Sequence, residues 1–166
     1  MDLSIYDVNA LNPSAFTAIF ANIYEATPAL AGAAYYTRPF ADRASLVDAF
    51  FAAVDALDHD GLLNVLRRYP ELGTAAPMTG DSESEQRRAG LTEAAAATCA
   101  RIGSANAAYL QHFGFPFIIA IRGLGVADIE AALCERLEHT ADDERSNALT
   151  QMKRIAELRI TALVRT

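Results

Sequence analysis

The 166-residue chain lacks several features, and each absence excludes a class of protein. No apolar run approaches the roughly 18 residues that a membrane-spanning helix needs. The N-terminus shows no charged segment followed by an apolar one, so we expect no secretion signal and a cytoplasmic protein. Lysine is nearly absent, since 13 of the 14 basic residues are Arg, and the formal net charge is −7. An acidic balance argues against nucleic-acid partners and against anionic membrane surfaces.

Cysteine and histidine are too scarce and too scattered for a metal site. Cys99 and Cys134 form no CxxC pair, and we expect both to be reduced thiols buried on apolar helix faces. His59, His112 and His139 lie at predicted helix junctions or ends without a catalytic partner beside them, which indicates surface or capping positions. Glycine-rich phosphate loops, serine elbows and HExxH motifs are also missing.

The residues that are present favour helices. Hydrophobic residues, many of them Ala, make up 52% of the chain. Capping residues predict helix starts at Asn12 and Thr27, each followed by Pro, and at Asp42. Thr92 opens a helix that Gly114 ends, and the last helix runs from about Asp142 to Val164. We predict an all-α fold, a single compact multi-helix bundle forming one domain over residues 1–166. It has a long loop at 70–81 and one short extended segment near 115–121.

Arg159 is the most informative charged residue. Met152, Ala156 and Leu163 form an apolar stripe on the last helix, and Arg159 falls inside it. A guanidinium there must reach solvent or meet an anion, because an unpaired buried charge costs several kcal/mol. Two alternatives remain: an internal ion pair, or a clamp for a substrate carboxylate.

A second polar set opens the helix that follows the loop. Ser82 and Glu85 match a capping box, and Glu83 is spaced to pair with Arg87. Capping and surface pairing are one interpretation of this set. A helix start also favours anions, and a Glu there can accept hydrogen bonds from the N–H groups of a urea-like ligand.

Four segments together resemble one family. They are RYPELG at 68–73, SESEQRRAGL at 82–91, NAAYLQHFGFPFIIAIRG at 106–123 and QMKRIAELRI at 151–160, and RPF at 38–40 fits as well. In this order and spacing the chain is similar to the 2-oxo-4-hydroxy-4-carboxy-5-ureidoimidazoline (OHCU) decarboxylases of urate degradation. The resemblance extends over nearly the whole chain. The pair of S-x-x-E-Q and FGFPFIIA is its most specific part.

The resemblance implies an all-helical enzyme of purine metabolism, often a homodimer, with neither metal nor organic cofactor. Its substrate would be a small ureidoimidazoline, which loses CO2 and is then protonated on one face to give S-allantoin. Among the matching positions, Arg159 and Glu85 would be catalytic. The substrate would be bound by Pro70, Ser82, Glu83, Ser84, Gln86 and the backbone of Phe117, Ile118, Ile119, Ala120 and Ile121.

At one position the chain departs from the family. The family carries an acid–base His immediately before the Pro that matches Pro70, and this chain has Tyr69 there. An imidazole titrates near neutrality, whereas a phenol has a reference pKa of about 10. One hypothesis is a decarboxylase in which Tyr69 is the catalytic proton donor. The alternative is a catalytically impaired member that binds a ureide or small carboxylate as a sensor or partner subunit.

Overall fold

The computed structural model describes residues 2–73, 79–91 and 96–165, and within them the regular elements are all helices. The prediction of an all-α fold is confirmed. The chain divides into two compact units. The first unit comprises Met1–Val65 with Lys153–Thr166, and the second comprises Leu66–Met152. That the whole chain is one domain stays a prediction.

The first unit begins with short, well-capped helices. Its helices are α1 (Ile5–Ala10), α2 (Pro13–Ile19), α3 (Pro28–Tyr35), α4 (Arg43–Asp55), nearly all of α5 (His59–Leu66) and the C-terminal part of α9 (Ala141–Leu163). The Asn12 side chain caps α2 and the Asp42 side chain caps α4, as predicted. The Thr27 hydroxyl donates to the Glu25 carbonyl instead of capping α3, although the helix still starts at Pro28. The sequence analysis missed α1, whose cap is a Ser4–Asp7 capping box.

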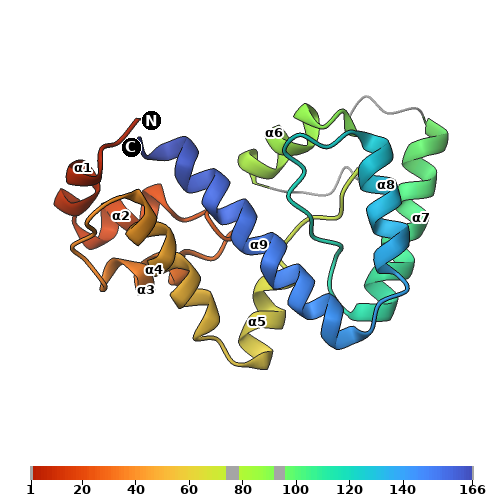
Figure 1. The fold of residues 1–166 in the computed structure, drawn as a ribbon, viewed down its shortest axis with the longest axis horizontal. Coiled ribbons are helices and arrows are strands. Elements are labelled where there is room, and N and C mark those ends of the chain that lie inside the picture. Colours follow the sequence, from red (N-terminus) through yellow and green to blue (C-terminus); the bar gives the residue numbers. More distant parts are fainter. Residues whose placement is uncertain (1, 74–78, 92–95, 166) are drawn as a thin grey trace. The chain divides into compact units, whose positions relative to one another are not determined.

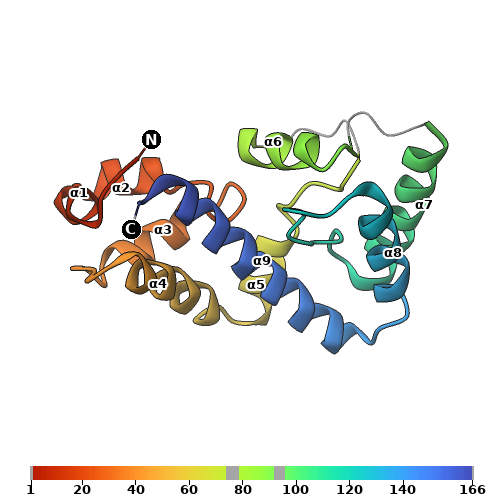
Figure 2. The same ribbon diagram turned by 45° about the horizontal axis from the view of Figure 1, so that its top comes forward.

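Aromatic rings fill the core of the first unit. The Phe16 ring lies 4.6 Å from the Phe20 ring, and Phe50 packs near both, all three almost fully buried. Helix α3 packs against α2 and α4 around this cluster (Figure 1). The two ends of the chain meet in the same unit, where Leu3 and Val164 form a parallel bridge (Figure 2). In the C-terminal part of α9 the apolar residues Ile155, Ala156 and Ile160 are buried.

The second unit contains α6 (Gly80–Arg88), α7 (Ala96–Phe113), α8 (Val126–Arg136) and the N-terminal part of α9. Helices α7 and α8 lie side by side (Figures 1 and 2). Gly114, with a φ of 76°, ends α7 as predicted, because L-residues rarely adopt the left-handed region. Residues 115–121, where a short extended segment was predicted, follow without helix or strand pairing. The predicted helix start at Thr92 and residues 74–78 of the predicted loop lie outside the described residues.

The prediction that both cysteines are buried is wrong. Cys134 is exposed, because it lies beside the apolar stripe of Ile129 and Leu133, and Cys99 is only half-buried. Both are free thiols. In the part of the chain that the structure describes, we find no helix with the length and apolar character of a membrane span.

Candidate active site

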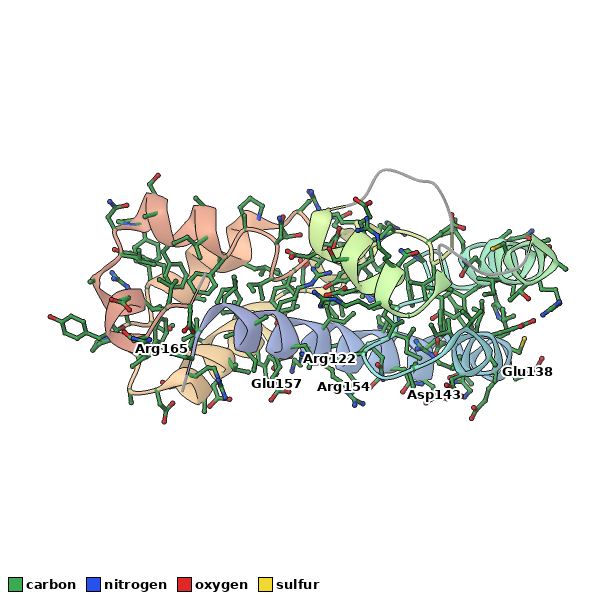
Figure 3. The ribbon with its side chains drawn as sticks, turned by 90° about the horizontal axis from the view of Figure 1, so that it is seen from above. Arg122, Glu138, Asp143, Arg154, Glu157 and Arg165 are labelled. Carbon is green, nitrogen blue, oxygen red and sulfur yellow. The ribbon has the colours of Figure 1, made fainter. Side chains whose placement is uncertain are left out.

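Arg159 lies in the first unit, on the buried face of α9. Only 6% of its surface is exposed, and its Nη1 donates to Glu25 Oε2 at 3.1 Å and to the Asn22 carbonyl at 2.7 Å. Glu25 is 2% exposed. The predicted internal ion pair therefore exists, with an acceptor that the sequence analysis missed. Arg154 and Glu157 occupy the opposite, exposed face of α9 (Figure 3).

The N-terminus of α6, in the second unit, differs from its prediction. Thr79 is the N-cap, and its hydroxyl accepts from the Ser82 N–H at 3.4 Å. The predicted Ser82–Glu85 capping box is wrong because the helix begins at Gly80, which places Ser82 inside the first turn. The Ser82 side chain is instead buried, at 4% exposure, and Glu85 is half-buried. The predicted Glu83–Arg87 pair is confirmed at 2.6 Å.

Tyr69 and Pro70 precede a peptide group that two buried amide side chains hold from opposite ends. Gln86 Oε1 on α6 accepts from the Gly73 N–H at 2.9 Å, and Asn106 Nδ2 on α7 donates to the Leu72 carbonyl at 2.7 Å. Because these groups belong to one planar peptide bond, the two side chains fix its orientation. Gln86 is 3% exposed and Asn106 is 1% exposed. Gln86 therefore anchors the loop that follows Tyr69, and the sequence analysis missed the role of Asn106.

Tyr69 itself is buried, with 7% of its surface exposed, and Pro70 is half-buried. The Tyr69 N–H donates to the Leu66 carbonyl at 3.2 Å, so the residue closes the turn that follows α5. The backbone at Tyr69 is held by a short turn on one side and by the anchored Leu72–Gly73 peptide on the other. The Tyr69 side chain is largely shielded from solvent.

The irregular segment 117–121 is anchored at two peptide groups. Arg136 Nη1 on α8 donates to the Ile118 carbonyl at 2.7 Å, and Gln151 Oε1 on α9 accepts from the Ala120 N–H at 3.0 Å. The peptide group of the Ile118 carbonyl also carries the Ile119 N–H, and the peptide group of the Ala120 N–H also carries the Ile119 carbonyl. In a trans peptide the N–H and C=O point in opposite directions, so both Ile119 groups point away from their anchors. A ureide presents the complementary acceptor and donor.

A buried ionic cluster holds the first of these anchors. Glu144 is fully buried, and both of its carboxylate oxygens lie 2.9 Å from Arg136 Nε. Tyr109 donates its hydroxyl proton to the same carboxylate, and Asn147 Nδ2 donates to it at 3.0 Å. The guanidinium of Arg136 also lies over the Phe117 ring, 4.5 Å from its centre. The cluster therefore connects α7, α8 and α9 to the irregular segment.

The cluster shifts the protonation of its members. Burial raises the pKa of the Glu144 carboxyl, but hydrogen bonds from Arg136, Tyr109 and Asn147 outweigh it and hold that pKa below its usual value. Burial and the hydrogen bond to Glu144 raise the pKa of Tyr109 far above its usual value. Both effects keep Glu144 as an anion and Tyr109 as a neutral donor.

Sequence reasoning missed this cluster, although a signal was present. Arg136 continues the stripe of Ile129 and Leu133, and Glu144 continues the stripe of Ala148 and Met152, as Arg159 does for its own stripe. His139 was expected to have only a surface or capping role. Its Nδ1 lies 3.2 Å from Glu144 Oε1, and its side chain is 32% exposed, so it borders the cluster.

The predicted site residues are therefore distributed over both units. Arg159 belongs to the first unit, and the second unit holds Tyr69, Pro70, the α6 set and segment 117–121. The second unit offers a phenol, a carboxylate and a hydroxyl together with directed backbone groups. Such groups suit proton transfer and the binding of a small polar ligand. Among the described residues, no three His, Cys, Asp or Glu side chains gather as metal ligands would.

Comparisons with known proteins match the chain along its length. The family model for OHCU decarboxylase matches residues 9–161, which spans both units. The 2-oxo-4-hydroxy-4-carboxy-5-ureidoimidazoline decarboxylase of Mus musculus is 34% identical over 98% of this chain and 93% of its own length. The enzyme of the same name from Bos taurus is 36% identical, with 98% of both chains covered. That of Haloferax volcanii is 34% identical over 96% of this chain and 95% of its own.

Solved structures agree with these sequence matches. The crystal structure of (S)-allantoin synthase has a TM-score of 0.80 and 25% identity, covering 99% of this chain and 55% of that one. The crystal structure of an OHCU decarboxylase in the presence of (S)-allantoin shares the fold, with a TM-score of 0.73, 22% identity, and coverage of 87% of this chain and 96% of that one. The family match and the full-length relatives together show that the chain belongs to the OHCU decarboxylase family.

Proposed function

We propose that this protein decarboxylates 2-oxo-4-hydroxy-4-carboxy-5-ureidoimidazoline and gives S-allantoin, with Tyr69 as the proton donor. The observation that carries the proposal is the match to curated decarboxylases along nearly the whole chain. The burial of the Tyr69 side chain and the hydrogen bond that holds its backbone support its role as the proton donor.

In the proposed reaction, the bond between the ring carbon and the carboxylate breaks and CO2 leaves. The electron pair of that bond is delocalised into the ring. The hydroxyl-bearing carbon then becomes a carbonyl carbon as a proton is taken up at the neighbouring ring carbon, which carries the ureido group. A phenol with an ordinary pKa of about 10 carries its proton at neutral pH and can donate it. Delivery from one side gives one enantiomer. The protein's contribution is positioning, charge stabilisation and this single aimed proton transfer.

The roles proposed for the other predicted site residues follow from the chemistry of their side chains and backbone groups. Arg159 grips a substrate carboxylate, since a guanidinium binds carboxylates bidentately. Glu85 accepts hydrogen bonds from the N–H groups of the ureido arm, and Ser82 and the backbone of 117–121 complete the polar contacts. Pro70, Glu83, Ser84 and Gln86 line or support the binding region. The protein is further proposed to act in the cytoplasm without metal or cofactor, and to form a homodimer.

The test follows the circular dichroism of freshly generated substrate with and without purified protein. Wild type should give S-allantoin faster than the spontaneous reaction, which yields the racemate. Tyr69→Phe should abolish this stereoselective rate, and Tyr69→His should retain or increase it. Tyr36→Phe is the matched control, because Tyr36 is an 81% exposed tyrosine of the other unit and its variant should behave as wild type.

Three other outcomes have distinct meanings. If only Tyr69→His is active, the binding region is intact but the natural chain is the catalytically impaired ureide or carboxylate binder. If neither protein exceeds the background rate, the proposed decarboxylation is wrong. If Tyr69→Phe is as fast as wild type, the chain is a decarboxylase that takes its proton from another group.

A further inference from the structure

The most unusual feature that the proposed chemistry does not use is the ionic cluster of Glu144, Arg136 and Tyr109, here called the buried triad. All three residues are at most 8% exposed, and they come from α9, α8 and α7 respectively. Replacing a buried ion pair with apolar residues of similar volume is often neutral or stabilising. Stability alone therefore does not explain why charges occupy this place.

The geometry offers another explanation. The Arg136 guanidinium has four distinct contacts. Its Nε binds Glu144, its Nη1 donates to the Ile118 carbonyl at 2.7 Å, its Nη2 donates to the Tyr109 hydroxyl at 3.4 Å, and its plane covers the Phe117 ring. An apolar residue can fill the same volume, but it cannot hold a backbone carbonyl. Glu144 in turn has no freedom to turn away, because Tyr109 and Asn147 also donate to it.

We infer that Arg136 is a positioning residue for ligand binding, and that Glu144 and Tyr109 set its orientation. By fixing the Ile118 carbonyl, Arg136 fixes the peptide group that carries the Ile119 N–H. Gln151 fixes the next peptide group through the Ala120 N–H, on the other side of Ile119. The buried triad thus aims a backbone donor at the ligand without touching the ligand itself. This inference rests on the proposed function, because it takes segment 117–121 as ligand-binding.

Two variants of the full-length protein test the role. Arg136→Lys keeps the charge but cannot reach Glu144 and Ile118 with the planar fork of a guanidinium. The triple variant Tyr109→Phe/Arg136→Met/Glu144→Leu removes the buried polar groups together and leaves none of the three partners behind. Circular dichroism in the far ultraviolet shows whether each variant is folded at the assay temperature.

The matched control is an ion pair between α7 and α8, two of the three helices that carry the buried triad. Arg101 on α7 is exposed and Glu130 on α8 is half-buried; they form a bidentate pair that has no contact with segment 117–121 among those the structure describes. Arg101→Met/Glu130→Leu removes a charge pair of the same composition. It should change neither ligand binding nor turnover.

Three measurements are made on each protein: kcat and KM with freshly generated substrate, the Kd for (S)-allantoin by calorimetry, and amide hydrogen exchange of Phe117–Ile121 without ligand. Both test variants should raise KM and Kd about tenfold, because small misplacements of binding groups have large effects, while kcat stays within about twofold. The segment's amides should exchange faster. The control double variant should match wild type in all three.

The outcomes separate the inference from the proposed function. If wild type is active and the folded variants keep wild-type KM, Kd and exchange rates, the positioning role is wrong and the proposed function stands. If the segment loosens but KM and Kd do not change, Arg136 is merely structural and the inference is overturned. If wild type neither turns over substrate nor binds (S)-allantoin, the proposed function fails, and the inference fails with it.

Discussion

Removing the Arg159 guanidinium should strongly destabilise the protein, and the structure sets the scale of the effect. Arg159→Met takes away the cation that faces the Glu25 carboxylate at 3.1 Å, while both residues lie almost wholly out of water. With an effective dielectric constant of about 20, a pair at this separation attracts by roughly 5 kcal/mol. Breaking a buried pair by removing one member costs about 3–5 kcal/mol in measured cases.

That loss is large beside the total stability. Domains of ordinary size unfold with about 5–15 kcal/mol, and for a chain of this length each kcal/mol lowers the Tm by about 2–4 °C. We therefore expect Arg159→Met to lower the Tm by about 6–20 °C. The double variant Glu25→Leu/Arg159→Met should recover most of the loss, since it removes both charges together.

Urea denaturation and calorimetry at pH 7 measure these differences. Arg154→Met is the matched control, because Arg154 lies on the exposed face of the same helix (Figure 3) and should change the free energy of unfolding by less than about 0.5 kcal/mol. A loss below about 1 kcal/mol in Arg159→Met, or a double variant no more stable than the single one, would refute the reasoning.

The double variant also separates the two interpretations of Arg159. Its fold is restored but its guanidinium is gone. If Arg159 grips the substrate carboxylate, the double variant should be folded and should lose affinity for the substrate, whereas (S)-allantoin, which has lost that carboxylate as CO2, should bind as it does to wild type. If the double variant binds the substrate as wild type does, Arg159 serves the ion pair alone and the proposed carboxylate clamp is wrong.

Two further predictions concern the second unit. Asn106→Leu leaves the buried Leu72 carbonyl without its donor and should lower the free energy of unfolding, measured by urea titration, by about 1–3 kcal/mol. The variant should change kcat by a larger factor than KM, because the Tyr69 loop is released. Equal stability of the variant and wild type would show that Asn106 does not anchor the loop. Tyr109→Phe removes a donor to ionised Glu144 and should cost about 2 kcal/mol at pH 7. Because the folded pKa of Glu144 is depressed, this stabilisation is present above its unfolded pKa of about 4.3 and is lost as pH falls through the lower folded pKa. The difference between wild type and Tyr109→Phe should therefore shrink in urea titrations at pH 4 and below, and a cost independent of pH would contradict the charged acceptor.

The elements of the fold were predictable where the signal is local. Asn12 and Asp42 cap their helices through side-chain bonds to the backbone three residues on, and Gly114 ends α7 through its own φ. The capping box predicted at Ser82 failed because two local signals competed. Thr79 lies three residues earlier and caps the helix, which leaves Ser82 inside it. Sequence alone does not rank such overlapping caps.

The types of residue in the candidate site could be predicted better than the partners that these residues bind. The apolar stripe of α9 showed that Arg159 needs an anion, and the family-like segments pointed to Tyr69, Glu85 and the backbone of 117–121. Gln86 was expected among the ligand-binding residues, and the structure shows one of its bonds on the loop at Gly73. The buried triad was missed because a charged residue on an apolar stripe indicates that it has a partner but does not indicate which residue that partner is.

The sequence therefore predicted the helical class, most of the helix starts and ends, the place of Arg159 on an apolar stripe and the resemblance to the family. Each of these depends on residues within a few positions of one another, or on a pattern along the chain. The folded structure was needed to show that Arg159 is buried against Glu25, that Asn106 and Gln86 hold one peptide group, and that Arg136 and Glu144 anchor the segment before α8. These partners lie between 8 and 134 residues apart in the sequence, and packing alone brings their atoms within hydrogen-bonding distance.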